Sequence, residues 1–262
     1  MIWRFLNCFY KKDDTVKKVF WSKSMIAIVA DAISVYEHKH QMLHLFYTHR
    51  RRTHLSVNDQ RVIGNCVVVD SNIPHAFYGT DVRIFIACID STTVLAERLH
   101  DLFIKENGYG IIDLSGNDDL FDPFLETPDN TSFTLFCKQL SGFLGIENFE
   151  VKGMDDRIRT LLDEINRFSH LKSTTGDLSK SLFLSESRLS HLFKEETGIP
   201  LKSYLVLIRV KKAYELLYRG KSITEAAVES GFYSASHLAD TCRKLTGLPM
   251  SEMIKDSSFL EA

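Results

Sequence analysis

One pattern of helix, turn and helix occurs twice in the C-terminal part of the chain, at residues 178–200 and 227–249, with an offset of 49 positions throughout. The matched positions are Leu178 and Ala227, Ser181 and Ser230, Phe183 and Phe232, Ser185 and Ser234, Ser187 and Ser236, Leu189 and Leu238, Phe193 and Cys242, and then Thr197-Gly198-Ile199-Pro200 and Thr246-Gly247-Leu248-Pro249. A single amphipathic helix pair is common in ordinary proteins, but a second copy in the same register is not. The repeat therefore predicts two helix-turn-helix units that enter successive major grooves of DNA.

The first copy carries local signals for its second helix. Ser185 is placed to cap that helix, although Arg188 three residues later leaves the capping box incomplete. Apolar residues recur at helical spacing and define a buried face, namely Leu189, Leu192 and Phe193. The opposite face presents Ser187, Ser190, His191 and Lys194. Gly198 provides a left-handed helix end, and Pro200 can open the next helix.

At these residues the chain resembles the AraC/XylS family of bacterial transcription regulators, over about residues 157–254. The markers are Leu184-Ser185-x-Ser187-Arg188-Leu189-x-x-Leu192-Phe193-Lys194-x-x-x-Gly198, Tyr204, Arg209-x-x-x-Ala213, Gly220, Ile223-x-x-Ala226 and Gly231-Phe232. The resemblance implies that one long helix, here from residue 200 to about 219, joins the two units. At 1.5 Å per residue this helix would be about 28 Å long, which suits recognition helices about 34 Å apart.

The second unit departs from the family pattern. Cys242 stands where the family usually has Phe, Thr246 where it has an aromatic residue, and Met253-Ile254 replace the usual Tyr-Arg ending. Its outward face reads Ala235, Ser236, Ala239, Asp240 and Arg243, with Asp240 in place of a basic or polar DNA contact. A carboxylate repels phosphates, although it can also accept a hydrogen bond from the amino group of cytosine. We therefore expect the second unit to contribute less to DNA recognition than the first.

The residues expected to meet DNA fall into two groups. Base edges would be read by Ser187, Ser190, His191 and Ser236, and phosphates would be bound by Arg188, Lys194, Lys202 and Arg243. The net charge of the chain is −2, and residues 155–256 hold 16 Lys and Arg against 14 Asp and Glu. Binding should therefore be salt-sensitive and depend on a few placed cations, with Arg209, Lys211, Lys212 and Arg219 also available. Members of the family often use the position of Arg209 to tie the linker helix to its neighbours.

The composition is that of an ordinary globular protein, with 262 residues, of which 44% are hydrophobic and 25% charged, enough for two domains. The cysteines, Cys8, Cys66, Cys88, Cys137 and Cys242, show no metal-ligand spacing and are interpreted as reduced thiols. The apolar residues 1–10 are too short and too aromatic a run for a signal peptide, and we expect a first strand there. Later apolar runs are shorter than a membrane span, so the expected compartment is the cytoplasm.

The N-terminal half is rich in short β-prone runs, at 25–30, 42–47, 67–69 and 83–89, bounded by Asn, Asp, Gly and Pro. Many short strands predict a sandwich or a barrel. The family resemblance favours a cupin-like jelly-roll barrel, because His38-x-His40, Gly64 and Ile73-Pro74-His75-x-Phe77 resemble a degenerate cupin pattern. The predicted fold class is α+β, with a cupin-like effector-binding barrel at 1–90, a helical segment for packing or dimerisation at 91–150, and an all-α DNA-binding domain at 155–262.

Four histidines raise the question of a metal: His38, His40, His44 and His75. Cupin enzymes hold an ion with two histidines on one strand, a carboxylate four residues later and a histidine on a facing strand, and here His44 takes the place of the carboxylate. Alternation would put the first three on one face of one strand. A metal site, an effector pocket and structural histidines all remain open. Because regulators of this family usually carry no metal, we expect none, and we assign effector binding to His38, His40, His75 and Phe77.

Two apolar helices are predicted between the strands and the repeat. One spans about 94–103, and the other runs from 133 to 144 with apolar residues on one face. They can pack on the barrel or on a second subunit, and both alternatives stay open. Residues 115–130 are predicted as an acidic loop with two prolines, and residues 147–154 as the linker to a helix at 155–167.

The combined expectation is a sequence-specific transcription regulator, an activator that responds to a small-molecule effector, and neither an enzyme nor the carrier of a cofactor. The expected partners are double-stranded DNA, RNA polymerase, the effector and a second copy of the chain, with no membrane. Two alternatives remain open. One is a cupin-type metal enzyme fused to a DNA-binding module, and the other is a protein–protein regulator whose second unit has lost DNA affinity.

Overall fold

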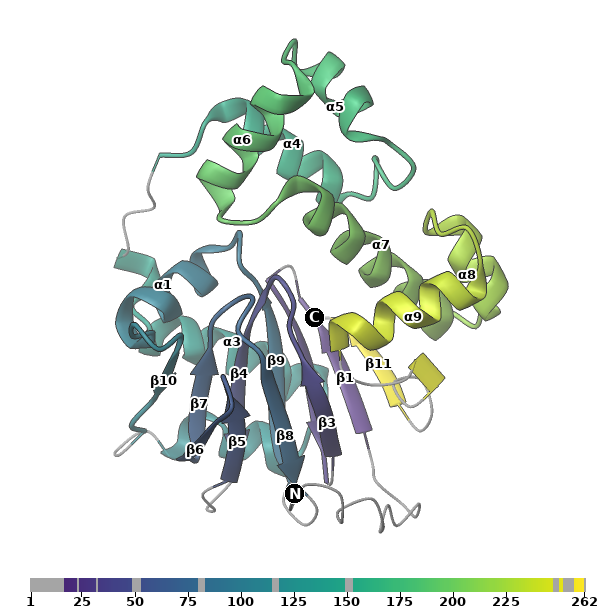
Figure 1. Ribbon diagram of the computed structural model, residues 1–262. Helices are drawn as coiled ribbons and strands as arrows, with labels where there is room; N and C mark the ends of the chain where they lie inside the picture. Colours follow the sequence, from purple (N-terminus) through teal and green to yellow (C-terminus); the bar gives the residue numbers. More distant parts are fainter. Residues whose placement is uncertain are drawn as a thin grey trace.

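The computed structural model describes residues 17–22, 24–31, 33–48, 53–79, 83–114, 118–148, 153–246, 250–251 and 257–261. The N-terminal half forms a β-sandwich, and the helices of the C-terminal half lie across one end of it (Figure 1). The first strand expected at residues 1–10 lies outside the described residues. Within the described ranges, no helix combines the length and the apolar character needed to cross a membrane.

The strands form two sheets. The larger has the order β10-β7-β4-β9-β2-β1-β11, and the smaller has the order β3-β8-β5-β6. The larger sheet consists of β1 (Lys17–Trp21), β2 (Met25–Ala30), β4 (Met42–Thr48), β7 (Cys66–Val69), β9 (Ile84–Asp90), β10 (Tyr109–Ile111) and β11 (Ser257–Glu261). The smaller consists of β3 (Ile33–His38), β5 (Thr53–Val57), β6 (Gln60–Gly64) and β8 (His75–Gly79). Neighbouring strands are antiparallel, except that β11 runs parallel to β1.

The predicted strands at 25–30, 42–47, 67–69 and 83–89 are confirmed as β2, β4, β7 and β9. The cupin-like barrel is not confirmed, because the described strands remain in two sheets that do not close. The chain leaves the smaller sheet after β3 and enters the larger one at β4, so these consecutive strands do not pair. Two sheets packed face to face bury their inner side chains without closure, and the rings of Phe46 and Phe77 stack between them at 6.1 Å.

The larger sheet is covered on both faces, which explains why every residue of β4 is buried. Its outer face carries α1 (Val94–Phe103), α2 (Asp122–Glu126) and α3 (Asn130–Phe143) (Figure 1). Phe20 of β1 packs against Phe124 and Phe133, with ring centroids 4.9 and 5.0 Å apart. The predicted helices thus pack on the sandwich. The predicted loop at 115–130 is only partly correct, since the short helices η1 (Asp118–Leu120) and α2 lie within it.

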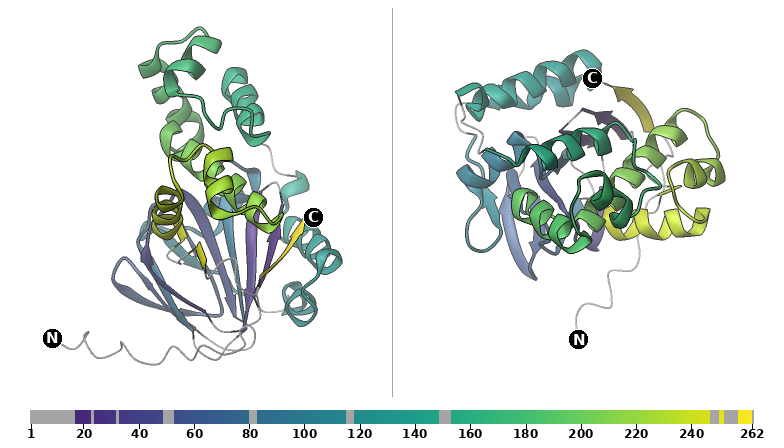
Figure 2. Two further views of the ribbon diagram at one scale, coloured as in Figure 1. Left: turned by 90° about the vertical axis from the view of Figure 1, so that its right-hand side faces the viewer. Right: turned by 90° about the horizontal axis from the view of Figure 1, so that it is seen from above.

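The C-terminal helices are α4 (Asp156–Asn166), α5 (Thr175–Ser181), α6 (Glu186–Thr197), α7 (Leu201–Tyr218), α8 (Ile223–Glu229) and α9 (Ala235–Thr246). The pairs α5–α6 and α8–α9 are the two predicted helix-turn-helix units, and α7 is the predicted long helix between them (Figure 1). Figure 2 shows the first unit standing clear of the sandwich and the second unit lying against it. In agreement with this view, α9 contacts β3.

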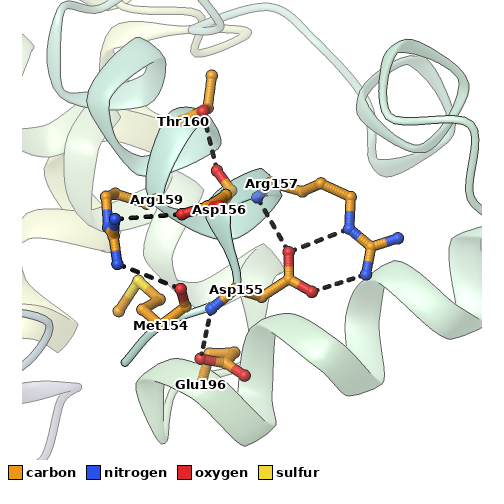
Figure 3. Close-up of polar contacts among 7 residues, drawn as sticks. All are labelled: Met154, Asp155, Asp156, Arg157, Arg159, Thr160 and Glu196. Atoms are coloured by element: carbon orange, nitrogen blue, oxygen red, sulfur yellow. Dashed lines mark hydrogen bonds and ion pairs between the residues drawn. The ribbon is translucent and has the colours of Figure 1, made fainter. Parts of the chain in front are cut away.

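The start of α4 is tied to the first unit by a small polar network (Figure 3). The carboxylate of Asp155 caps α4 by accepting from the backbone N–H of Arg157 at 2.9 Å, and it pairs with the Arg157 guanidinium at 2.6 Å. This pairing lowers the pKa of Asp155 to about 2. The backbone N–H of Asp155 donates to Glu196 of α6 at 3.1 Å, so the first turn of α4 is held against α6.

The helical part and the sandwich also meet at buried polar and apolar contacts. The hydroxyl of Tyr204 on α7 lies 3.1 Å both from Asp90 at the end of β9 and from Asn166 of α4. One apolar core runs from between the sheets into the second unit, and it includes Phe46, Tyr214 and Leu238. The first unit has a largely separate core around Phe193 and Tyr204. The second unit is therefore the one that shares its core with the sandwich.

Candidate functional site

The recognition helix of the first unit, α6, presents the predicted polar face to solvent. Ser185 caps the helix by accepting from the N–H of Arg188 at 3.2 Å, and Gly198 ends it with a φ of 73°. The side chains of Ser187, Arg188, His191 and Lys194 are exposed, and that of Ser190 is half-buried. Leu189, Leu192 and Phe193 are buried on the opposite face, as predicted. The arrangement leaves two hydroxyls, an imidazole and two cations on one exposed surface.

The turns of the two units differ by one residue. The N–H of Leu184 donates to the carbonyl of Ser179 at 2.9 Å, and the N–H of Phe232 donates to that of Ala227 at 2.8 Å, an offset of 48. The second helices, α6 and α9, are offset by 49. The uniform offset of 49 is therefore wrong in the first helices and turns, and the exposed Tyr233 is the additional residue of the second turn.

The left-handed residue of each turn shows the same offset of 48. Phe183 has a φ of 55° and Gly231 a φ of 87°. Phe183 is 96% exposed, so its hydrophobic ring does not correspond to that of the buried Phe232. At Gly231 a Cβ atom would lie 2.6 Å from the carbonyl oxygen of Leu171, so this position requires glycine both for its conformation and for its close contact with the segment before α5.

The second recognition helix, α9, also keeps its predicted outward face. Ser236, Asp240 and Arg243 are exposed, whereas Ala235 and Ala239 are half-buried. The sequence interpretation missed His237, which is exposed on the first turn of α9 at the position equivalent to Arg188. Its ring stacks on that of Tyr233 at 6.0 Å.

Cys242, which stands where the family usually has Phe, lies in the apolar core shared with the sandwich. Its side chain is fully buried, and burial raises the pKa of its thiol to about 12. The nearby hydroxyl of Tyr214 on α7 partly offsets that effect. The larger tyrosine therefore reaches across from α7 toward the position where the family usually has Phe.

The cations of the helical part divide into free and engaged groups. Arg188, Lys194, Lys202 and Arg243 are exposed and form no ion pair with any residue that the structure describes. Lys212 pairs with Glu215 at 3.0 Å, and so does Arg219 at 3.0 Å. The free cations are the ones that the sequence assigned to phosphate contacts.

Arg209 has a structural position. Its Nε donates to the carbonyl of Leu171 at 2.6 Å, and its Nη2 donates to the carbonyl of Ser173 at 3.4 Å. These carbonyls belong to the segment between α4 and α5, and the Leu171 carbonyl is the one that approaches Gly231. Arg209 thus joins α7, the first unit and the turn of the second unit at one point.

A narrow cavity lies between the sandwich and the helices, with a volume of about 50 Å³. Its wall is almost entirely apolar and is made by Val19, Ile26, Ile28, Ile33, Val35, Met42, Phe46, Ile86 and Cys88 of the sandwich, by Leu207, Val210, Tyr214 and Tyr218 of α7 and by Leu245 of α9. The polar side chains in the wall are His40, His44 and Lys211. About 10–15 Å³ of such volume holds one water, so the cavity has room for a few water molecules.

Lys211 is the charged residue of this cavity, and the sequence interpretation wrongly grouped it with DNA-facing cations. It points from α7 toward the sandwich and lines both the cavity and a small adjoining pocket with Asp90. Burial lowers the pKa of Lys211, while Asp90 and Glu215 partly offset that effect. Its ammonium forms no ion pair within the described part of the chain. The geometry therefore leaves a partly desolvated cation beside an apolar space.

The four histidines come together at the end of the sandwich beneath α7, although His38, His40 and His44 do not share one strand as predicted. His38 ends β3, His40 lies in the following connection, His44 belongs to β4 and His75 opens β8. All four are buried, and burial is the main cause that lowers the pKa of each imidazole, to about 4 for His75. Of the residues expected to bind an effector, His40 lines the cavity, whereas His38, His75 and Phe77 do not.

Comparisons with known proteins agree with this arrangement. Residues 178–256 match a family model described as a helix-turn-helix domain. An uncharacterized HTH-type transcriptional regulator of Staphylococcus aureus strain MSSA476 is 32% identical over 93 residues, which are 35% of this chain and 12% of the relative. The chain thus spans about an eighth of the length of that relative. The probable transcriptional regulator LumQ of Photobacterium leiognathi is 23% identical over 228 residues, 80% of this chain and 88% of LumQ.

The solved structure of ToxT from Vibrio cholerae matches the fold with a TM-score of 0.57 at 15% identity, over 89% of this chain and 98% of ToxT. At this identity the likeness concerns the fold, in which a β-rich half precedes helical units. The helix-turn-helix match covers the repeat, and the likeness to LumQ extends over most of the chain. The repeat is thus similar in sequence to helix-turn-helix domains of transcriptional regulators, and the two-part fold is similar to that of ToxT.

Proposed function

We propose that this protein activates transcription from specific DNA sites and that a slim anionic molecule in the cavity beneath α7 controls its second helix-turn-helix unit. The observation that carries the proposal is the half-buried Lys211 in a largely apolar cavity bounded by the sandwich, α7 and α9. The proposal has two parts, the reading of DNA and the response to the effector, and each has its own test.

The first unit is proposed to dominate DNA recognition. Ser187, Ser190 and His191 would approach base edges, where hydroxyl and imidazole groups form hydrogen bonds with several bases. On the second helix only Ser236 and Arg243 offer comparable contacts, and Asp240 opposes the phosphates. Lys172 and Lys202 line a groove between the units, where a DNA backbone passing between two major grooves would meet them.

The chemistry of the cavity favours a ligand with an anionic head and a slender apolar tail. An ammonium removed from water without a partner is costly, and an incoming carboxylate would provide that partner. The apolar wall would bury the tail, and the small volume disfavours bulky rings. ToxT, which shares the fold, has been crystallised with an unsaturated fatty acid bound. We therefore propose a fatty-acid-like carboxylate as the class of effector.

The proposed effector would act on the second unit directly. The cavity wall includes Tyr214 of α7 and Leu245 of α9, and the core of the second unit is continuous with the core of the sandwich. A tail inserted there must displace side chains that also position α9 against β3. The first unit, whose core is largely separate, would keep its own geometry. Effector binding is thus expected to change the contribution of the second unit to DNA affinity.

DNA reading can be tested by selecting sequences from a random duplex library with the full chain. We expect one enriched sequence with two parts about 10 base pairs apart, the stronger part being the one that changes in the His191→Ala variant. The matched control is Lys138→Ala, an exposed cation on α3 far from both units. The absence of an enriched sequence would refute this part and would favour a regulator that acts only through proteins.

The effector can be tested by calorimetric titration with oleate and with oleyl alcohol as the uncharged counterpart. Lys211→Met should weaken oleate binding by about tenfold or more, because a charged hydrogen bond contributes about 1.5–3 kcal/mol. Oleyl alcohol should bind to the native chain more weakly than oleate does. Its affinity should be the same for the native chain and for Lys211→Met. The control is Lys138→Met, which should bind oleate normally. Equal oleate affinity with and without Lys211 would refute the proposed site.

Two further partners follow from the family and are proposed with it. RNA polymerase would be the target of activation. A second copy of the chain is proposed to pack on α3, whose outer face carries the half-exposed Leu135. Sedimentation of native and Leu135→Glu chains would test the dimer, since a charge at the interface should dissociate it. A native chain that sediments as a monomer would contradict this proposal.

A further inference from the structure

The four buried histidines form a cluster in which the rings lie against one another. Their possible ligand nitrogens all lie within 4.8 Å of one another. The ring centroids of His38 and His75 are 4.4 Å apart, and those of His40 and His44 are 4.5 Å apart. The cluster spans both sheets, because His44 belongs to the larger sheet and His38 and His75 to the smaller one. Two of its members, His40 and His44, also line the proposed effector cavity, where Lys211 is the residue proposed to bind the ligand.

Each ring has one nitrogen that forms no hydrogen bond with any residue in the described part of the chain. These atoms are Nε2 of His38, Nε2 of His40, Nδ1 of His44 and Nε2 of His75. A buried polar atom without a hydrogen bond destabilises a folded protein, so four such atoms together are unfavourable for this fold. Replacement by apolar side chains would remove that cost. A cluster of this kind is best explained by an occupant that all four nitrogens bind.

The backbone orients two of the rings as ligands. Nδ1 of His38 donates to the carbonyl of Tyr36 at 2.8 Å, and Nδ1 of His75 donates to the carbonyl of Ile73 at 2.7 Å. Each bond keeps the proton on Nδ1 and leaves a lone pair on Nε2. Backbone carbonyls that fix the tautomer of a histidine in this way are characteristic of the second shell of metal sites.

The other two rings, His44 and His40, differ in whether their cluster-facing nitrogen has a lone pair available for a metal ion. Nε2 of His44 lies 3.4 Å from the thiol of Cys88, which leaves its Nδ1 toward the cluster. Nδ1 of His40 accepts from the backbone N–H of Met42 at 3.0 Å, so the neutral ring carries its proton on Nε2. His40 can therefore become a ligand only by giving up that bond. Three rings are thus ready to bind an ion, and the fourth needs to turn.

We propose that His38, His44 and His75, completed by His40, bind a divalent transition metal ion, with Zn²⁺ the first candidate. Four imidazoles without a carboxylate suit zinc, nickel, copper or iron and do not suit magnesium or calcium. Zinc–nitrogen bonds of about 2.0–2.1 Å place tetrahedral ligands about 3.4 Å apart, so the rings would close by about 1 Å. The ion would cross-link the two sheets at the wall of the cavity.

The test uses the full chain after removal of metals by a chelator. Calorimetric titration with Zn²⁺ should show one ion per chain, and Co²⁺ should develop the visible absorption of tetrahedral coordination. His75→Gln and His38→Gln should each weaken Zn²⁺ binding by more than the 10–100-fold that loss of an outer-shell partner causes. His40→Gln should weaken it less. The matched control is His100→Gln, an exposed histidine on α1, which should leave binding unchanged.

Two results would overturn the proposal. One is a native chain that binds neither Zn²⁺ nor Co²⁺, which would mean that water or nothing occupies the cluster. The other is binding that survives both the His38 and the His75 substitutions, which would place the ion elsewhere. If either variant loses its circular dichroism, the Co²⁺ spectrum of the native chain decides between these outcomes. The measurements involve neither DNA nor oleate, so their failure leaves the proposed regulator untouched.

Discussion

Replacing Arg209 by alanine tests how the two helix-turn-helix units are held in one geometry. The substitution removes the 2.6 Å bond to the Leu171 carbonyl and the longer 3.4 Å bond to the Ser173 carbonyl. A hydrogen bond from a charged group contributes about 1.5–3 kcal/mol, and the longer bond adds less. We therefore expect the free energy of unfolding to fall by about 2–3 kcal/mol. For a chain of this size, that corresponds to a Tm lower by about 4–12 °C.

The effect on DNA should be selective. The face of α6 is unchanged in the Arg209→Ala variant, so the part of the site read by the first unit should keep its preferred bases. Affinity for the complete site should fall toward that for the first part alone, because the turn at Gly231 is no longer held against Leu171. Lys202→Ala on the same helix is the matched control. Its side chain is exposed, so stability should change by less than about 0.5 kcal/mol.

Urea unfolding followed by circular dichroism gives the stability, and fluorescence anisotropy over a series of salt concentrations gives the affinity. Lys202→Ala should weaken all sequences alike and lower the salt slope by about one, as expected for a lost phosphate contact. The reasoning would be refuted if Arg209→Ala showed this same behaviour with unchanged stability. Arg209 would then bind phosphate, and the contacts to Leu171 and Ser173 would be incidental.

Three further outcomes are expected. His191→Ala and Ser187→Ala should each weaken binding by about 1–3 kcal/mol and relax one base position in a repeated selection, whereas an unaltered preference would show that α6 meets DNA by another face. Asp240→Arg should strengthen binding in anisotropy titrations, most at low salt, because an attraction replaces a repulsion; weaker binding would indicate that Asp240 reads a cytosine. The pKa of Asp155 is lowered from 3.8 to about 2, so its ionised carboxylate contributes its full stabilisation above pH 3.8 and loses it as the pH falls through 2. Asp155→Asn should therefore flatten the dependence of Tm on pH in that window. An equal slope in the variant and the native chain would argue against the pairing with Arg157.

Much of the helical part was predictable because its signals are local. The cap at Ser185, the left-handed Gly198 and the spacing of Leu189, Leu192 and Phe193 all lie within a few turns of one another. The predicted helices accordingly match α4, α6 and α7 to within a residue or two. The extra residue at Tyr233 was not predicted, because alignment of Phe183 with Phe232 makes the offset look uniform. Only the backbone hydrogen bonds of the two turns show the insertion.

The strands were found by their β-prone composition, but their partners were not. Sequence patterns report that a side chain avoids water, and they do not report which surface covers it. The pairing of β11 with β1 joins residues separated by almost the whole chain, which no local pattern encodes. For the same reason, the sequence predicted a closed barrel where the structure has two separate sheets.

The sequence by itself determined the two helix-turn-helix units, the helix joining them and the side chains that face outward from α6, because periodicity and capping act within a single helix. Tertiary structure alone decided the roles of Lys211 and the histidines. In the sequence, Lys211 is one more cation on a basic helix. Only the packing of the sandwich against α7 partly desolvates its ammonium. The histidines converge only because β3, β4 and β8 bring distant residues to one end of two sheets, where burial deprives four nitrogens of solvent at once.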